Sequence, residues 1–215
     1  GANITSRLMS VPLYAMVFNK YLSDPLQNEL SASAESTVRK AALTVAHPTR
    51  SGLVFDGENI WFVGKDTNPV SAIPYLSKVN ILTVTDTVID LGLASATWTV
   101  GRGCYAKNNV WFGVRESGGK IYLYRCDIFD NTVSLSLSLT GTSIIPATDG
   151  QYIYIASIPT GDTSYWIYKY SVDSSLNLTL ESSYDTTSTG ANRLIYAADF
   201  LWMTNSAGTL YKINP

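Results

Sequence analysis

Three arginines occupy nearly equivalent places relative to later tryptophans. Arg102 and Arg193 each lie nine residues before a tryptophan, and Arg50 lies eleven residues before another. A guanidinium is always charged and presents a planar fork of N–H donors that fits carboxylate and phosphate oxygens. The spacing therefore predicts a basic ring that binds an anion, provided that the fold brings the three side chains to one face. A solvated, charged rim is the alternative interpretation.

Three aromatic residues are a second set of candidate ligand-binding groups. Tyr75 and Tyr165 fall in the two longest predicted connections, 65–77 and 157–165, and Trp98 falls in a connecting segment of its own. Long connections in a compact fold often carry function, and recognition surfaces are enriched in aromatic rings. We therefore predict that Tyr75, Trp98 and Tyr165 contribute to a binding face, with sugar stacking as one use.

Catalytic residues are not predicted. His47 is the single histidine, so a Ser–His–Asp or Cys–His arrangement would have to be built on this one predicted loop residue. Cys104 and Cys126 fall on the first and third strands of one predicted sheet, roughly 9–10 Å apart. That separation exceeds the limit of about 7 Å for a disulfide, so we expect two free thiols in unreactive surroundings.

Metal and cofactor sites are not predicted either. Asp56, Asp149 and Asp199 stand singly in predicted turns, where Asp commonly hydrogen-bonds its own backbone. Zinc would need clustered Cys and His, and calcium several carboxylates in one loop. The stretch 116–119 (ESGG) lacks the glycine–lysine pattern of a phosphate-binding loop.

The composition limits the classes of partner. The net charge of −2 arises from 15 basic and 17 acidic residues, so nothing draws the whole chain to nucleic acid or an anionic membrane. Charged residues make up only 15% and aromatics 12%, with 14 tyrosines. We found no apolar run of 18 residues and expect no membrane insertion. The start at Gly1 instead of Met favours a processed, excised or tagged chain.

One phrase recurs four times and organises the chain. Each copy has a polar turn followed by an aliphatic residue and an aromatic anchor. The anchors are Trp61, Trp111, Tyr154 and Trp202, at steps of 50, 43 and 48 residues. This period is typical of repeats in which each unit is one four-stranded sheet. Because the anchors recur at one position of one strand, we expect them to pack between sheets.

Each repeat predicts an innermost strand, the anchor strand and a third strand. The expected innermost strands are 53–56, 103–106, 145–148 and 194–197. The expected third strands are 79–82, 121–124, 166–169 and 210–213. The chain ends after the third strand of the last repeat. The segment 38–45 resembles the outermost strand of a repeat, because a polar loop and a new copy of the phrase follow it, and it would supply the missing fourth strand. This pairing would remove two open sheet edges.

These repeats resemble the β-propeller repeats of virginiamycin B lyases and YVTN surface antigens. The similarity rests on the Asp-Gly-x-x-Ile-Trp phrase at 56–61 and on the stretch 201–213, and it covers residues 38–215. The resemblance implies blades stacked around an axis. Virginiamycin B lyases also use histidine and a metal, and a chain with only His47 departs from that pattern. Two copies keep Asp-Gly, and four repeats are fewer than those families commonly have.

We therefore predict an all-β fold, a small β-propeller of four blades with the last closed by an N-terminal strand. Five blades, with residues 13–18 in another blade, are the alternative. Residues 1–37 would form an arm or docking segment before a propeller at 38–215. The expected role is a non-enzymatic binding or assembly module, such as a virion or tail component or an adhesin, with a lectin as the alternative and a lyase or hydrolase less favoured.

The expected partners are a protein or a glycan, with a homo-oligomer through residues 1–37 and no nucleic acid. The sequence does not fix the compartment. An extracellular surface or a virion is favoured because the surface is polar and weakly charged.

Overall fold

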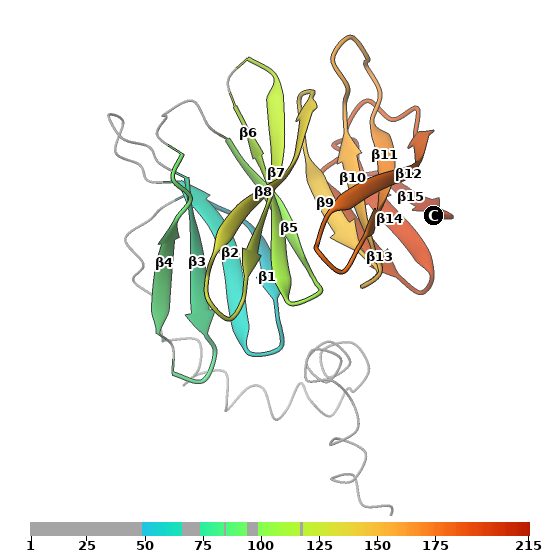
Figure 1. Ribbon diagram of the computed structural model, residues 1–215. Coiled ribbons are helices and arrows are strands. Elements are labelled where there is room, and N and C mark those ends of the chain that lie inside the picture. Colours follow the sequence, from blue (N-terminus) through green and yellow to red (C-terminus); the bar gives the residue numbers. More distant parts are fainter. Residues whose placement is uncertain (1–48, 66–73, 84, 94–98, 117) are drawn as a thin grey trace, which may run out of the picture. The chain divides into compact units, whose positions relative to one another are not determined.

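The computed structural model describes residues 49–215 except 66–73, 84, 94–98 and 117, and these belong to one compact unit that spans 47–215. The described residues form fifteen strands and no helix (Figure 1). None of them therefore forms a helix able to span a bilayer. The predicted arm 1–37, the closing strand 38–45, the segment 13–18 and His47 lie outside the described residues.

The strands follow one another in four antiparallel sheets, each built in chain order. The first two sheets contain β1 (Thr49–Phe55), β2 (Asn59–Lys65), β3 (Pro74–Asn80), β4 (Asp86–Asp90), β5 (Thr99–Ala106), β6 (Asn109–Arg115), β7 (Lys120–Asp127) and β8 (Val133–Thr140). The other two contain β9 (Ile145–Thr148), β10 (Tyr152–Ser157), β11 (Trp166–Val172), β12 (Leu178–Asp185), β13 (Arg193–Ala197), β14 (Phe200–Thr204) and β15 (Leu210–Ile213). We call these sheets blades 1 to 4.

The four sheets are arranged as a four-bladed β-propeller, which confirms the predicted fold class. The first strands of successive blades contact one another, β1 against β5, β5 against β9 and β9 against β13. Because consecutive strands run antiparallel, the turns alternate between two ends of the blades. The hairpin face carries the β1–β2 and β3–β4 turns and their equivalents, and the loop face carries the β2–β3 and β4–β5 connections and theirs.

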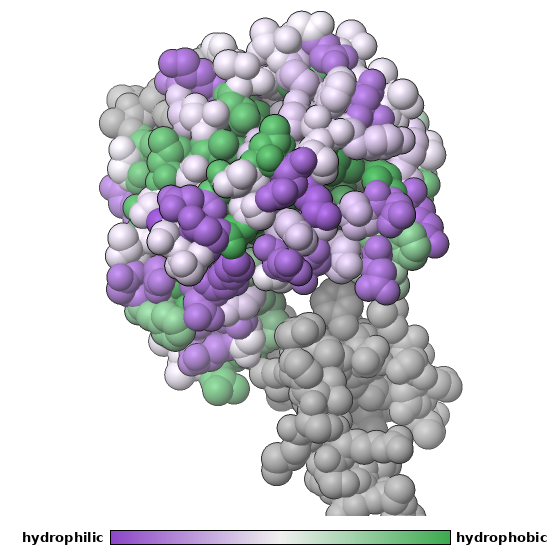
Figure 2. Space-filling view, turned by 45° about the vertical axis from the view of Figure 1, so that its right-hand side comes forward, coloured by the Kyte–Doolittle hydropathy of each residue, from purple (hydrophilic) through white to green (hydrophobic). Residues whose placement is uncertain are grey.

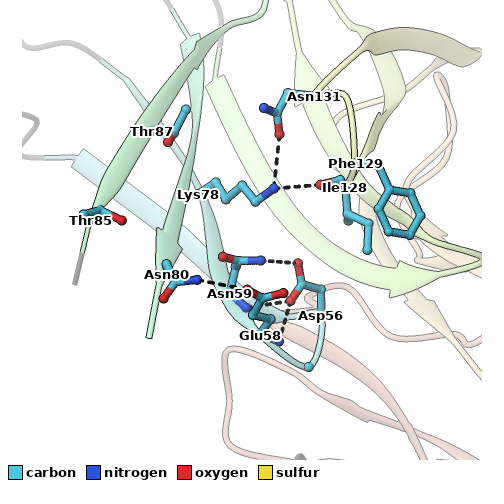
Figure 3. A pocket seen from close by; sticks show the side chains of 11 residues that line it. Asp56, Glu58, Asn59, Lys78, Asn80, Thr85, Thr87, Ile128, Phe129 and Asn131 are labelled. Atoms are coloured by element: carbon cyan, nitrogen blue, oxygen red, sulfur yellow. Dashed lines mark hydrogen bonds between the residues drawn. The ribbon is translucent and has the colours of Figure 1, made fainter. Parts of the chain in front are cut away.

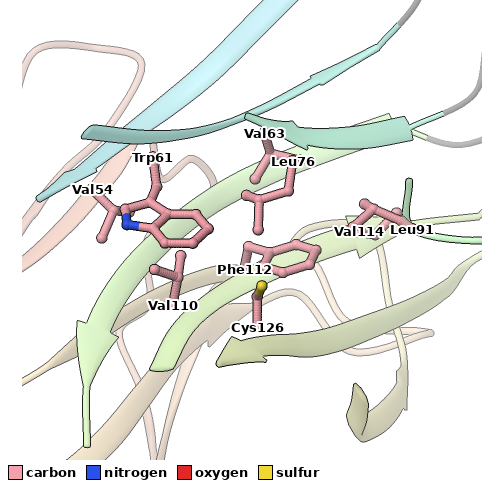
Figure 4. Close-up of a cluster of buried hydrophobic side chains, with 9 residues drawn as sticks. All are labelled: Val54, Trp61, Val63, Leu76, Leu91, Val110, Phe112, Val114 and Cys126. Atoms are coloured by element: carbon pink, nitrogen blue, oxygen red, sulfur yellow. The ribbon is translucent and has the colours of Figure 1, made fainter. Parts of the chain in front are cut away.

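Hydrophobic clusters fill the spaces between neighbouring blades. Trp61 of blade 1 packs with Val110 and Phe112 of blade 2 (Figure 4). Trp111 of blade 2 packs with isoleucines of β10, and Tyr154 of blade 3 packs with Leu201 and Met203 of blade 4. Both faces of the second strands meet a neighbouring layer, which explains why most of their residues are apolar.

Three of the four predicted anchors are core residues. Trp61 and Trp111 are 0% exposed and Tyr154 is 1% exposed. Trp202 is only half-buried and belongs to none of the hydrophobic clusters among the described residues. Blade 4 also has three described strands where the others have four.

One predicted strand was misplaced. The third strand of blade 1 was expected at 79–82, but β3 spans Pro74–Asn80. The Asn80 side chain accepts hydrogen bonds from the backbone N–H groups of Leu82 and Thr83, and this forms a turn where the apolar run had indicated a strand. Leu82 is consequently 82% exposed. The predicted long connection 65–77 is shortened at its end, since Tyr75 belongs to β3.

Candidate functional site

A pocket of about 470 Å³ opens on the hairpin face between blades 1 and 2 (Figure 3). Its walls come from the β1–β2 turn, the end of β3, the start of β4 and the β7–β8 turn. The lining residues are Asp56, Gly57, Glu58, Asn59, Lys78, Asn80, Thr85, Thr87, Ile128, Phe129 and Asn131. Polar side chains dominate this set, and the volume suits a small ligand.

Asp56 organises the floor of the pocket. One carboxylate oxygen accepts the backbone N–H groups of Glu58 and Asn59, at 2.8 and 2.6 Å. The other accepts the Asn59 amide at 3.1 Å and the Trp61 indole N–H at 2.6 Å. Burial opposes ionisation of this carboxyl, but these donors outweigh it and lower the pKa of Asp56 below its usual 3.8. Asp56 is thus an ionised, fully engaged structural group, as the turn interpretation predicted.

Lys78 ties the two walls of the pocket together. Its ammonium donates to the Ile128 carbonyl of blade 2 at 2.7 Å and to Oδ1 of Asn131 at 3.4 Å. The same ammonium lies 5.0 Å from the centroid of the Trp61 ring. The only cationic side chain among the described lining residues is therefore already held by protein groups.

Several polar groups of the lining keep hydrogen-bonding capacity. Glu58 accepts the Asn80 amide through one oxygen at 3.2 Å, and its second oxygen has no partner among the described residues. Within the same part of the chain, the Thr87 hydroxyl and the Asn131 amide nitrogen also have none. Phe129 stands at the rim with 75% of its surface exposed. The pocket thus offers acceptors, donors and one apolar ring.

The predicted arginines lie at the other end of the blades. Arg102 is half-buried in a β-bulge of β5, and Arg193 is exposed at the first position of β13. Burial and the charge of Arg193 both lower the pKa of Arg102, so Arg193 lies near enough for its charge to act on Arg102. Arg50 pairs with Gly64 in the β1–β2 ladder, and its side chain lies outside the described part.

The predicted aromatic surface is not formed by the tyrosines. Tyr75 is 4% exposed and packs with Phe62 and Val79, and Tyr165 is 7% exposed in the core between blades 3 and 4. Both rings are buried in hydrophobic clusters. The prediction that these two tyrosines contribute to an exposed binding face is therefore corrected. Trp98 lies outside the described residues.

The two thiols are free, as predicted. Cys104 is on β5 and Cys126 on β7, with β6 between them. Burial raises the pKa of Cys126 to about 12 and moves the pKa of Cys104 further upward, so neither is activated as a thiolate. Among the described residues no group of three His, Cys, Asp or Glu side chains could hold a metal ion.

Lys78 and the rest of the pocket were missed in the sequence. A partial signal existed, since Arg125, Lys169 and Lys212 stand at one position of the other third strands. The register shows that each lies opposite the anchor of its blade, and Lys78 lies opposite Trp61 in the same way. The misplaced third strand of blade 1 hid this equivalence. Phe129 and Asn131 carried no signal, because they meet blade 1 only through the fold.

No protein-family model matches the sequence, and no curated protein matches it significantly. Solved structures match the fold. The computationally designed Ika4 protein aligns with a TM-score of 0.51 and 16% identity, over 78% of this chain and 92% of that one. TolB from Acinetobacter baumannii aligns with a TM-score of 0.51 and 16% identity, over 79% of this chain and 44% of TolB.

The β-propeller domain of the Trilobed protease from Pyrococcus furiosus aligns with a TM-score of 0.50 and 10% identity, over 77% of this chain and 57% of that one. The chain thus spans about half the length of the last two structures. At these identities the matches show the β-propeller fold alone. The predicted propeller is confirmed, and the finer resemblance to virginiamycin B lyases and YVTN antigens stays a prediction.

Proposed function

We propose that this propeller is a non-enzymatic binding module that takes a glycan in the pocket between blades 1 and 2. The observation that carries the proposal is the pairing of a polar pocket of about 470 Å³ with the exposed ring of Phe129 at its rim. The fold is consistent with a binding or assembly module, and glycan binding is the finer step that we add.

The chemistry of the lining fits a ligand rich in hydroxyl groups. Sugar hydroxyls both donate and accept, so different hydroxyls of one ligand can meet the free Glu58 oxygen, the Thr87 hydroxyl and the Asn131 amide. The C–H face of a sugar ring is apolar and can cover the ring of Phe129, which has a large apolar body. A strongly anionic ligand fits less well, because Lys78 is already engaged and Asp56 and Glu58 are acidic.

A glycan array with the full chain, followed by calorimetry with the best ligand, tests this proposal. Phe129→Ala should weaken binding about tenfold, by analogy with the roughly 1–3 kcal/mol that one aromatic ring contributes when it stacks on a nucleic-acid base. Tyr184→Ala is the matched control, because Tyr184 is also an exposed aromatic, at 58%, and lies on blade 3. An array without hits, or equal effects of the two variants, would reject the glycan site.

An assembly role is the second candidate function, and the surface of blade 4 favours it. Ile195 and Leu210 are 55% and 58% exposed, and Trp202 is half-buried. Figure 2 shows that hydrophobic residues reach the surface in separate patches among hydrophilic ones. A protein partner or a second copy of the chain could cover the blade 4 residues. A virion or tail component or an adhesin is the setting in which we place such a module.

Light scattering on the full chain tests the assembly role. If blade 4 docks a second copy, Ile195→Lys should lower the measured mass to that of a monomer, because a charge would be buried without a partner. Leu180→Lys on blade 3, also at an exposed position, should leave the mass unchanged. A monomer in all three proteins would rule out self-assembly through blade 4.

A further inference from the structure

The loop face, at the end of the blades opposite the pocket, holds a second candidate site. Val100 pairs with Val114 and Gly103 with Phe112, so Gly101 and Arg102 together oppose the single residue Gly113. This is a β-bulge, a feature that redirects side chains at the ends of strands and beside binding sites. Arg102 therefore leaves the regular ladder of β5.

The first strands of blades 1 to 3 meet closely around this bulge. A Cβ atom on Gly52 would lie 2.9 Å from the Cα of Arg102, and one on Gly101 would lie 2.9 Å from the Ile144 carbonyl oxygen. Gly52 itself is the extra residue of a bulge in β1, with a φ of +63°. Backbone contacts of this kind fix the position of Arg102 between blade 1 and the start of blade 3.

Arg193 reaches the same region from the other side of β9. Ile145, the first residue of β9, packs in one cluster with Leu194, the residue after Arg193. Gly101, the residue before Arg102, meets Ile144, the residue before Ile145. The two arginines thus flank the start of β9 at the same end of the blades.

The two guanidinium charges are not neutralised by the protein groups that the structure describes. Neither Arg102 nor Arg193 forms an ion pair with a described carboxylate, and the charge of Arg193 acts on Arg102 as a like charge. Partial burial of Arg102 adds a desolvation cost for its charged form. An anion held between the two residues would offset both penalties.

We propose that Arg102 and Arg193 form an anion-binding site that holds one compact oxyanion, a carboxylate or a phosphate group, at the loop face. Two forked donors from different blades can share the oxygens of one such group. The site is independent of the glycan pocket, because it shares none of its residues.

Calorimetric titration of the full chain with inorganic phosphate and with malonate, at low ionic strength, tests the site. At least one anion should bind, and the tighter one distinguishes a phosphate source from a carboxylate source. Arg193→Gln and Arg102→Gln should each weaken binding about tenfold, as for a lost charge-assisted hydrogen bond, and the double variant should abolish it. Lys120→Gln removes another exposed cation near the loop face and should change the affinity less than about twofold.

Arg193 is exposed, so its variant should keep the fold and decides the test even if Arg102→Gln is unstable. Absence of binding by both anions would overturn the proposal. An equal loss in Lys120→Gln would also overturn it, because it would indicate a diffuse positive field instead of a built site. Phe129→Ala should leave anion binding unchanged, so this result is separate from that of the glycan experiment.

Discussion

Blades 2 and 4 share their local geometry and differ in how deeply they are buried. In both, the anchor tryptophan donates its indole N–H to the carbonyl five residues earlier, Trp111 to Ala106 at 3.1 Å and Trp202 to Ala197 at 2.9 Å. Both anchors follow a two-residue turn whose residues all have positive φ. Yet Trp111 is 0% exposed and Trp202 is half-buried.

The difference shows that the repeat unit positions the anchor and that the neighbouring blade buries it. Blade 2 lies between blades 1 and 3, whereas blade 4 has a described neighbour on one side only. Two residues of the terminal first strands, Leu53 of β1 and Ile195 of β13, are accordingly 74% and 55% exposed. We therefore expect the same turn and hydrogen bond to accompany a smaller contribution to the free energy of unfolding in blade 4 than in blade 2.

The largest effect is expected when the two anchors are truncated in turn. Trp111→Ala should lower the free energy of unfolding by about 3–5 kcal/mol, because a fully buried ring leaves a cavity. Trp202→Ala should cost less than half of that, about 1–2 kcal/mol, since water already reaches this ring. Urea denaturation followed by circular dichroism measures both. Equal costs would break the comparison and indicate that Trp202 is covered in solution.

A smaller effect is expected from the backbone contact between blades 2 and 3. Gly101→Ala places a methyl group 2.9 Å from two carbonyl oxygens, those of Gly113 and Ile144. Both are backbone atoms, which cannot shift as freely as the end of a side chain. We expect a loss of about 1–3 kcal/mol from overpacking. Ile195→Ala removes three carbons from blade 4 but should cost less than about 1 kcal/mol, because this side chain is 55% exposed. Thermal denaturation of both variants compares the loss of stability at the close contact of Gly101 with the loss at the exposed surface of blade 4.

The sequence was sufficient for the elements that repeat. The aromatic anchors and their spacing predicted the second strands, the four blades and the burial of Trp61, Trp111 and Tyr154, because hydrophobic periodicity follows directly from burial. It also placed Arg102 and Arg193 at equivalent positions, and in the structure the charge of Arg193 acts on Arg102. The half-exposed Trp202 was not predicted, since its burial depends on a neighbouring blade and not on its own repeat.

The pocket could not be predicted, because it forms where two separate turns meet. Lys78 donates to Ile128, which is 50 residues later, and no motif joins them. The run 79–82 also resembled a strand, but the Asn80 side chain accepts two backbone N–H groups and helps to form the turn at which β3 ends. Residues 38–45, proposed to complete blade 4, lie outside the described part, and that pairing stays a prediction.

The smallest expected effect on stability concerns the group that accepts the hydrogen bond of the anchor residue. Blades 2 and 4 use a backbone carbonyl, whereas Trp61 of blade 1 donates to the carboxylate of Asp56. Asp56→Asn should lower the free energy of unfolding at pH 7 by about 1–2 kcal/mol, because hydrogen bonds to a charged acceptor are the stronger kind. Asp90→Asn, where the carboxylate holds one exposed N–H, should change it by less than about 0.5 kcal/mol.

The pH dependence identifies the cause. Because the pKa of Asp56 is lower in the folded protein than its usual 3.8, its contribution is complete above the unfolded pKa and is lost as the pH falls through the folded pKa. A protonated Asp56 resembles asparagine, so the stabilities of the wild type and Asp56→Asn should begin to approach each other as the pH falls below about 3.8 and should become equal only below the lower, folded-state pKa. A difference that persists there would show that shape, and not charge, holds the Trp61 indole, and blade 1 would then behave like blades 2 and 4.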